Sequence, residues 1–126
     1  MQKAGFARSP KYVYNVGMSD VLGAFEQAVL LALLRLRKDA YGRAILNDVQ
    51  ARLAREVAAG AVYATLDRLE KKGLASSRLA AGGAIRGGKA RRYYSIEPSG
   101  VRALNESRAA HDALWRGVAL PMGGRA

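Results

Sequence analysis

The chain contains no cysteine and only one histidine, His111, among its 126 residues. The absence of thiols excludes disulfides, zinc–cysteine centres and cysteine nucleophiles. One histidine leaves almost nothing from which to build an imidazole metal site or an acid–base pair, and the ten acidic residues fall in no recognisable catalytic spacing. We therefore predict a protein that is not an enzyme and that holds neither a metal nor another cofactor.

Long apolar runs are also missing. The longest, residues 28–34 (AVLLALL), is followed directly by Arg35, and it is far shorter than the roughly 20 residues with which a helix crosses a bilayer. The residues after Lys3 lack the apolar stretch of a signal peptide. We expect a cytoplasmic protein without a membrane partner.

Acidic residues are scarce beside the 21 lysines and arginines, which leaves a net charge of +11. The excess is concentrated between Arg68 and Arg92, where eight basic residues and one acid, Glu70, leave a net charge of +7. Such a concentration favours a polyanionic partner, with nucleic acid ahead of an anionic membrane surface. An ordinary solvated face is the alternative.

Half of the residues are apolar, which is enough for a core in a chain of one-domain length. Apolar periodicity predicts helices over residues 20–36, 41–53 and 59–72, with Ser19 or Asp20 as the cap of the first. Two strands are expected over 74–80 and 92–96, and a last helix over 98–115. Gly73 suits a helix end and Pro98 a helix start. The fold class is therefore mainly α with a small β-hairpin.

The same pattern divides the chain into four parts. Residues 1–17 show no periodicity and are expected to be a flexible N-terminal extension. Residues 18–97 hold the three helices and the hairpin, residues 98–116 the last helix, and residues 117–126 a flexible tail.

The second and third helices, joined by a short turn and followed by a glycine-rich basic hairpin tip at 81–90, predict a winged helix-turn-helix. The third helix begins with small residues, AAGA at 58–61, which would let its backbone approach a DNA groove. Its outward positions include Gly60, Tyr63, Ala64, Arg68 and Lys71. For Tyr63 a packing role beside the hairpin is the alternative, and for Arg68 that of a plain surface cation.

The hairpin tip also matches the spacing of a nucleotide phosphate loop, from Gly83 to Lys89. Ala90 stands where the metal-binding hydroxyl would be, and a strand follows where a helix is needed. A DNA-binding wing suits the tip better, because its glycines permit close approach to phosphates that Arg86 and Lys89 neutralise.

The first helix is apolar on more than one face, through Phe25, Val29, Leu33 and other residues. A surface helix carries one apolar stripe. We therefore expect this helix to pack against a partner chain as well as against its own domain.

Three ordered blocks of sequence within residues 22–106 resemble the PadR family of bacterial transcriptional regulators. The most specific pieces are Ala40-Tyr41-Gly42, then Gly60-Ala61-Val62-Tyr63 with Leu66, Leu69, Glu70 and Gly73, and finally Tyr93-Tyr94 before Pro98 and Gly100. Ala59 and Ala64 depart from the family, which often has hydroxyl residues there, and this puts some base or phosphate contacts in doubt.

The resemblance implies a winged helix-turn-helix with residues 59–72 as the recognition helix, residues 81–90 as the wing and dimerisation through the first and last helices. The DNA-binding residues expected on these grounds are Tyr41, Gly60, Tyr63, Ala64, Arg68, Lys71, Arg86, Lys89 and Arg91. Those expected at the dimer interface are Phe25, Val29, Leu33, Leu104, Leu114 and Trp115. Trp115 either packs in that interface or lines a pocket for a small aromatic effector.

The function expected from all of this is that of a dimeric, sequence-specific regulator that binds a double-stranded DNA operator. A repressor released by a small-molecule effector is the form expected. The alternative is a winged-helix module that binds a protein or RNA without operator specificity.

Overall fold

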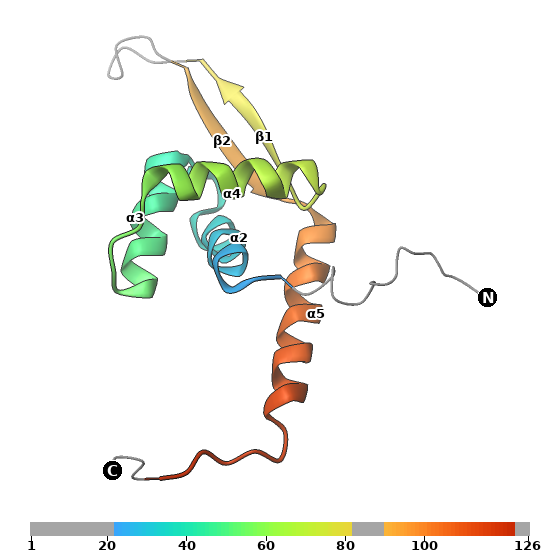
Figure 1. The fold of residues 1–126 in the computed structure, drawn as a ribbon. Helices are drawn as coiled ribbons and strands as arrows, with labels where there is room; N and C mark the ends of the chain where they lie inside the picture. The colour runs from blue at the N-terminus through green and yellow to red at the C-terminus, as the bar shows by residue number, and fades with distance from the viewer. Residues whose placement is uncertain (1–21, 82–89, 123–126) are drawn as a thin grey trace, which may run out of the picture. The chain divides into compact units, whose positions relative to one another are not determined.

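The structure is a computed structural model that describes residues 22–81 and 90–122. The chain divides into two compact units, of which residues 22–104 form one and the remainder the other. The elements are α2 (Ala24–Leu36), a 3-10 turn η1 (Arg37–Asp39), α3 (Gly42–Leu53), α4 (Ala59–Lys71), β1 (Ala75–Ala80), β2 (Arg91–Ile96) and α5 (Pro98–Trp115) (Figure 1). The predicted order of helices and strands is confirmed.

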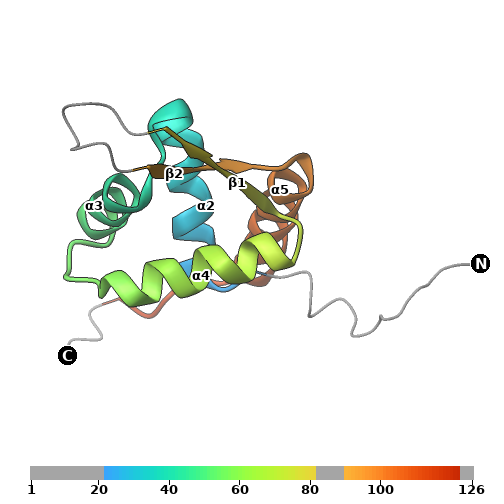
Figure 2. The ribbon, with the colours of Figure 1, turned by 90° about the horizontal axis from the view of Figure 1, so that it is seen from above.

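The core of the 22–104 unit is built around α2, which lies between α3, α4 and the β-hairpin (Figures 1 and 2). Each of the three helices contributes one stripe of apolar side chains with helical spacing. The fully buried members are Val29 and Leu30 of α2, Ile45 and Val49 of α3, and Val62, Leu66 and Leu69 of α4. The stripe predicted for the third helix, Val62, Leu66 and Leu69, is buried. Of the stripe predicted for the second helix, Ile45 and Val49 are buried, but Leu53, the last residue of α3, is 36% exposed.

The start of α2 differs from the predicted one. Gly23 occupies the N-cap position, and its backbone N–H donates to Oε1 of Glu26 at 3.4 Å, which satisfies one of the donors left open at a helix start. The predicted caps, Ser19 and Asp20, lie outside the described residues.

The hairpin is attached to the beginning of α3. β1 and β2 pair antiparallel from Ala75 opposite Ile96 to Ala80 opposite Arg91. Tyr94 N donates to the carbonyl oxygen of Ala40 at 2.8 Å, and Tyr41 forms an isolated bridge with Tyr93. The residues just before α3 therefore pair with β2, and this pairing holds the base of the hairpin beside the helix-turn-helix.

Described by itself, the 105–122 segment contains the later turns of α5 and a C-terminal stretch with exposed apolar side chains. Leu114 is 78% exposed and Trp115 47%, and the Trp115 ring lies 6.2 Å from that of His111 between centroids. In residues 22–81 and 90–122, no helix has both the length and the apolar character that a membrane crossing requires.

Candidate nucleic-acid interface

The outer side of α4 is open. Opposite the buried stripe of this helix lie Gly60, Ala64, Asp67 and Lys71, all of them exposed. Figure 2 shows α4 at the edge of the 22–104 unit, with α2 and the hairpin behind it. Lys71 Nζ pairs with Asp67 Oδ2 at 3.0 Å, so the two larger residues neutralise each other. Gly60 and Ala64 leave the helix backbone accessible to a groove.

Tyr63 lies at the junction of α4 and α3. Its side chain leans over Gly42, the first residue of α3, so closely that a Cβ at Gly42 would lie only 2.6 Å from Cε1 and would overlap the hydroxyl oxygen. Tyr63 is nevertheless half exposed. Both roles considered for this tyrosine are therefore compatible with its position, because it packs against α3 and still presents its phenol to solvent.

Aromatic rings and guanidinium groups alternate at the base of the hairpin. The Arg91 guanidinium lies 3.8 Å from the centroid of the Tyr41 ring, and that of Arg78 lies 5.2 Å from the centroid of Tyr93. The two rings meet edge to face at 5.9 Å. Cation–π contacts of this kind restrict a long side chain, so Arg91 is held beside the start of α3.

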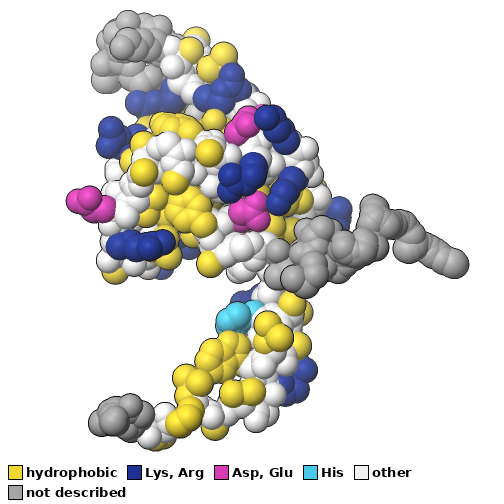
Figure 3. All heavy atoms as spheres, viewed as in Figure 1, with side chains coloured by type: hydrophobic (Ala, Val, Ile, Leu, Met, Phe, Trp, Pro, Cys, Tyr) yellow, Lys and Arg dark blue, Asp and Glu magenta, His cyan; other side chains and the backbone are white. Residues whose placement is uncertain are grey.

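These residues border a hollow of about 310 Å³. Its lining consists of Tyr41, Gly42, Arg43, Tyr63, Ala90, Arg91, Arg92 and Tyr94. Three arginines and no acid give it a positive potential that suits a phosphate. Figure 3 shows Lys and Arg side chains gathered over α4 and the hairpin base, with apolar and a few acidic side chains between them.

The prediction missed two of the lining arginines, Arg43 and Arg92. Arg92 is placed by a chain of hydrogen bonds that starts on α4: Ser77 Oγ donates to Glu70 Oε2 at 2.7 Å, and Arg92 Nη1 donates to Ser77 Oγ at 2.9 Å. The sequence placed Arg92 in the stretch of concentrated positive charge but did not select it as a DNA contact, and no periodic pattern connected Arg43 to that stretch.

Tyr94 also lines the hollow. Burial raises the pKa of its phenol, which therefore remains protonated at neutral pH.

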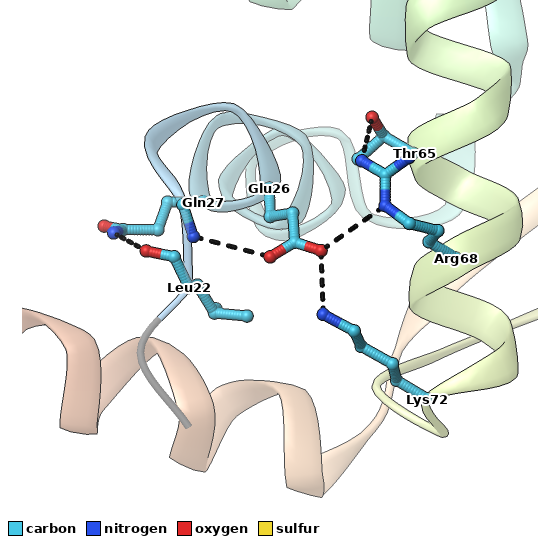
Figure 4. Close-up of polar contacts among 7 residues, drawn as sticks. Leu22, Glu26, Gln27, Thr65, Arg68 and Lys72 are labelled. Carbon is cyan, nitrogen blue, oxygen red and sulfur yellow. Dashed lines mark hydrogen bonds and ion pairs between the residues drawn. The ribbon is translucent and has the colours of Figure 1, made fainter. Parts of the chain in front are cut away.

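Arg68, predicted to contact a base or a phosphate of DNA, makes polar contacts within its own chain. Its Nη2 donates to Thr65 Oγ1 at 3.1 Å, and its Nε lies 3.7 Å from Oε2 of Glu26 on α2. Lys72 Nζ reaches the same carboxylate oxygen at 3.0 Å. Figure 4 shows the Glu26 carboxylate pointing at both cations. The structure therefore assigns the Arg68 guanidinium a contact that joins α4 to α2, although its side chain is still 54% exposed.

Glu26 is the shared partner in both ion pairs, and its side chain is only 13% exposed. Burial by itself would raise the pKa of Glu26, but the hydrogen bond and charge of Lys72, the Gly23 N–H and the charge of Arg68 outweigh it, so that the pKa lies below its ordinary value. A carboxylate whose folded pKa is lowered stabilises the fold above its unfolded pKa, and that contribution is lost as the pH falls through the folded pKa.

We expect Glu26→Gln to lower the free energy of unfolding by about 0.5–1 kcal/mol at pH 7, because both cationic partners are about half exposed and solvent weakens the pairs. The difference from wild type should shrink as the pH falls through the folded pKa of Glu26, since the carboxylate is then protonated. Urea unfolding at a series of pH values from 7 downward measures this. The matched control is Glu56→Gln, which removes an exposed carboxylate; an equal loss there would mean that net charge alone is responsible.

The remaining predicted residues fall into three groups. Arg86 and Lys89 lie outside the described residues. Val29 and Leu33, expected at a dimer interface, are buried in the core of their own chain. Phe25 and Leu104 pack partly buried against the same core. The exposed apolar residues of α2 are instead Leu31 and Leu34.

Together, the α3–turn–α4 unit and the adjoining hairpin define a winged helix-turn-helix domain. Its open helix side and its positively charged hollow lie in the same 22–104 unit.

Comparisons with known proteins specify the family. The model of the "Transcriptional regulator PadR-like family" matches residues 30–106. Among solved structures, a PadR-family regulator from Eggerthella lenta is 35% identical over 71% of this chain and 75% of that one, with a TM-score of 0.57. A PadR-like transcription factor from Bacteroides fragilis is 26% identical over 79% of this chain and 89% of that one, with a TM-score of 0.61.

PadR of Bacillus subtilis, solved in complex with operator DNA, is 22% identical over 79% of this chain and 53% of that one, with a TM-score of 0.55, and shows the likeness of fold alone. A comparison with curated proteins gives no match. The chain belongs to the PadR-like family of transcriptional regulators.

Proposed function

We propose that the protein is a cytoplasmic transcriptional repressor that binds a double-stranded DNA operator as a dimer. The observation that carries the proposal is the open outer side of α4, where Gly60 and Ala64 are exposed beside an acid-free hollow that Arg43, Arg91 and Arg92 line. A helix with small outward residues fits the major groove, and arginines at its flank neutralise the adjacent phosphates.

Tyr41, Tyr63, Lys71 and Arg91 are the described residues that we assign to backbone contacts, and Gly60 and Ala64 to close approach. The solved complex of Bacillus subtilis PadR with operator DNA supports the assignment by analogy of fold. Arg86 and Lys89 of the wing segment are proposed as further phosphate contacts from their charge alone.

The dimer is proposed from exposed apolar surface. Leu31 and Leu34 on α2 are exposed in one unit, and Leu114 and Trp115 at the end of α5 are exposed in the other. Exposed groups of large apolar side chains mark surfaces that a partner covers. A small aromatic effector beside Trp115 stays a prediction.

The test is retention of genomic DNA fragments from the source organism, followed by sequencing and a titration. We expect retained fragments to share two half-sites about one helical turn apart. Arg91→Ala should weaken duplex binding about tenfold and reduce the slope of log K against log salt by about 1 per chain, whereas Arg52→Ala, at an exposed position of α3 outside the hollow, should change both far less.

Fragments without a shared motif would contradict operator recognition. Preferential retention of RNA or of a protein would support the winged-helix interaction module instead.

A further inference from the structure

One serine hydroxyl connects α4 with the hairpin strand that borders the hollow. Ser77 Oγ, on β1, donates to Oε2 of Glu70 on α4 at 2.7 Å, and it accepts from Nη1 of Arg92 on β2 at 2.9 Å. Arg92 lines the hollow, whereas Ser77 and Glu70 do not. The hydroxyl therefore lies one step behind an exposed cation of the candidate interface.

The direction of both hydrogen bonds is fixed by the chemistry of the partners. An ionised carboxylate can only accept a hydrogen bond, and a guanidinium can only donate one. A serine hydroxyl has one proton to donate and lone pairs with which to accept, so it satisfies both neighbours at once. A methyl group in its place would leave the Glu70 carboxylate and the Arg92 guanidinium without this connection.

The register of the hairpin brings Ser77 within reach of Arg92. Ser77 lies opposite Tyr94, and Arg92 precedes Tyr94 by two positions on β2. Side chains two residues apart share one face of a strand, so all three lie on the same face of the hairpin. A diagonal neighbour on that face is close enough for a long side chain to reach. Glu70, in the last turn of α4, extends the connection to the helix whose outer side is open.

This connection restrains Arg92 without neutralising it. The Glu70 carboxylate forms no ion pair with Arg92, or with any other cation of residues 22–81 and 90–122. The guanidinium of Arg92 donates to Ser77 and forms no other hydrogen bond with a described residue, so its other N–H groups remain available. An arginine that is already held in place loses less side-chain entropy on binding than a freely moving one.

We propose that Ser77 is a positioning residue for duplex binding: its hydroxyl holds the Arg92 guanidinium at the hollow, where the guanidinium contacts a backbone phosphate. The connection through Glu70 ties that contact to α4, so the helix and the hairpin meet the duplex as one preorganised surface. This role rests on the proposed function, because the phosphate belongs to the bound duplex.

The test compares two substitutions of nearly equal shape. Ser77→Thr keeps the hydroxyl, Ser77→Val replaces it with a methyl group, and both new residues are favourable in a strand. The full chain is titrated with a duplex retained in the genomic selection. We expect Ser77→Thr to bind within about twofold of wild type and Ser77→Val to bind about threefold to tenfold more weakly, because Arg92 must then be ordered on binding.

Ser76→Val is the matched control. Ser76 is the neighbouring residue of β1, its side chain lies on the other face of the strand, and that side chain forms no hydrogen bond with a described residue. This variant should keep wild-type affinity.

A double-mutant cycle distinguishes positioning from a purely structural role. Arg92→Ala alone should weaken binding about tenfold and reduce the slope of log K against log salt by about 1 per chain. Adding Ser77→Val to Arg92→Ala should cost nothing further, because the residue through which Ser77 acts is then absent. Urea unfolding of each variant establishes that the titrations are made on folded chains.

Equal affinities of Ser77→Thr and Ser77→Val, or wild-type affinity in Arg92→Ala, would overturn the positioning role and leave the proposed function in place. A loss from Ser77→Val that is as large in the Arg92→Ala background as in wild type would assign the hydroxyl to hairpin packing alone, which also overturns the role. A wild-type chain that binds no duplex would contradict the proposed function itself, and this role with it.

Discussion

Gly60→Glu is expected to abolish duplex binding while it stabilises the fold. Nothing lies within 4 Å of the position that a Cβ at Gly60 would occupy, so the new side chain fits. Glutamate is a better helix former than glycine, and its charge is favourable in the first turn of α4, which together should add about 1 kcal/mol to the free energy of unfolding. The same carboxylate would face the phosphates of a bound duplex, and the repulsion should reduce affinity by about 100-fold or more.

Gly60→Glu is diagnostic because the free energy of unfolding should rise while the affinity for duplex DNA falls. The measurements are urea unfolding and duplex titration on the same preparation. Ala51→Glu, at an exposed position of α3, makes the same change in net charge and should reduce duplex affinity far less. If Gly60→Glu kept wild-type affinity, the outer side of α4 would not be the DNA-facing surface.

Gly100→Ala should be strongly destabilising, although alanine is the better helix former. A Cβ at Gly100 would overlap the backbone carbonyl oxygen of Leu74 and lie 2.7 Å from Cγ1 of Ile96. The carbonyl cannot move freely, because it accepts a hydrogen bond from Glu97 N at 2.9 Å. Overpacking of this kind costs about 1–3 kcal/mol or more, which in a domain of this size lowers the melting temperature by about 10 °C.

Thermal unfolding followed by circular dichroism measures the effect of Gly100→Ala. Gly60→Ala is the matched control, since it makes the same substitution in a helix where the space is open, and it should raise the melting temperature slightly. A wild-type melting temperature for Gly100→Ala would mean that α5 does not approach Leu74 as closely as the structure shows.

The order and type of the elements could be predicted from the sequence because each signal is local. Val62, Leu66 and Leu69 recur with helical spacing, and the structure buries all three. Gly73, expected at a helix end, has φ +77°. Boundaries were harder to predict, as at α2, where Gly23 rather than an upstream polar residue precedes the first turn. The η1 turn was missed because its RKD sequence carries no periodicity.

The candidate site was predicted only in part, because charge and spacing along the chain do not say which cations meet. Arg43 and Arg92 were not selected, although they line the same hollow as Arg91. Arg68 was selected as a DNA contact, yet its guanidinium lies near Glu26, a residue 42 positions earlier in the chain. A contact between α2 and α4 depends on how two helices cross, and no local pattern in the sequence contains that information.

By itself, the sequence determined the class of fold and the sign of the charge on its functional surface, because helical periods, turn residues and net charge are properties of short stretches. Tertiary structure decided which arginines share a hollow and which leucines are covered by the chain's own core. Those facts depend on distances between segments far apart in the chain, and such distances are fixed only when the helices and the hairpin pack together.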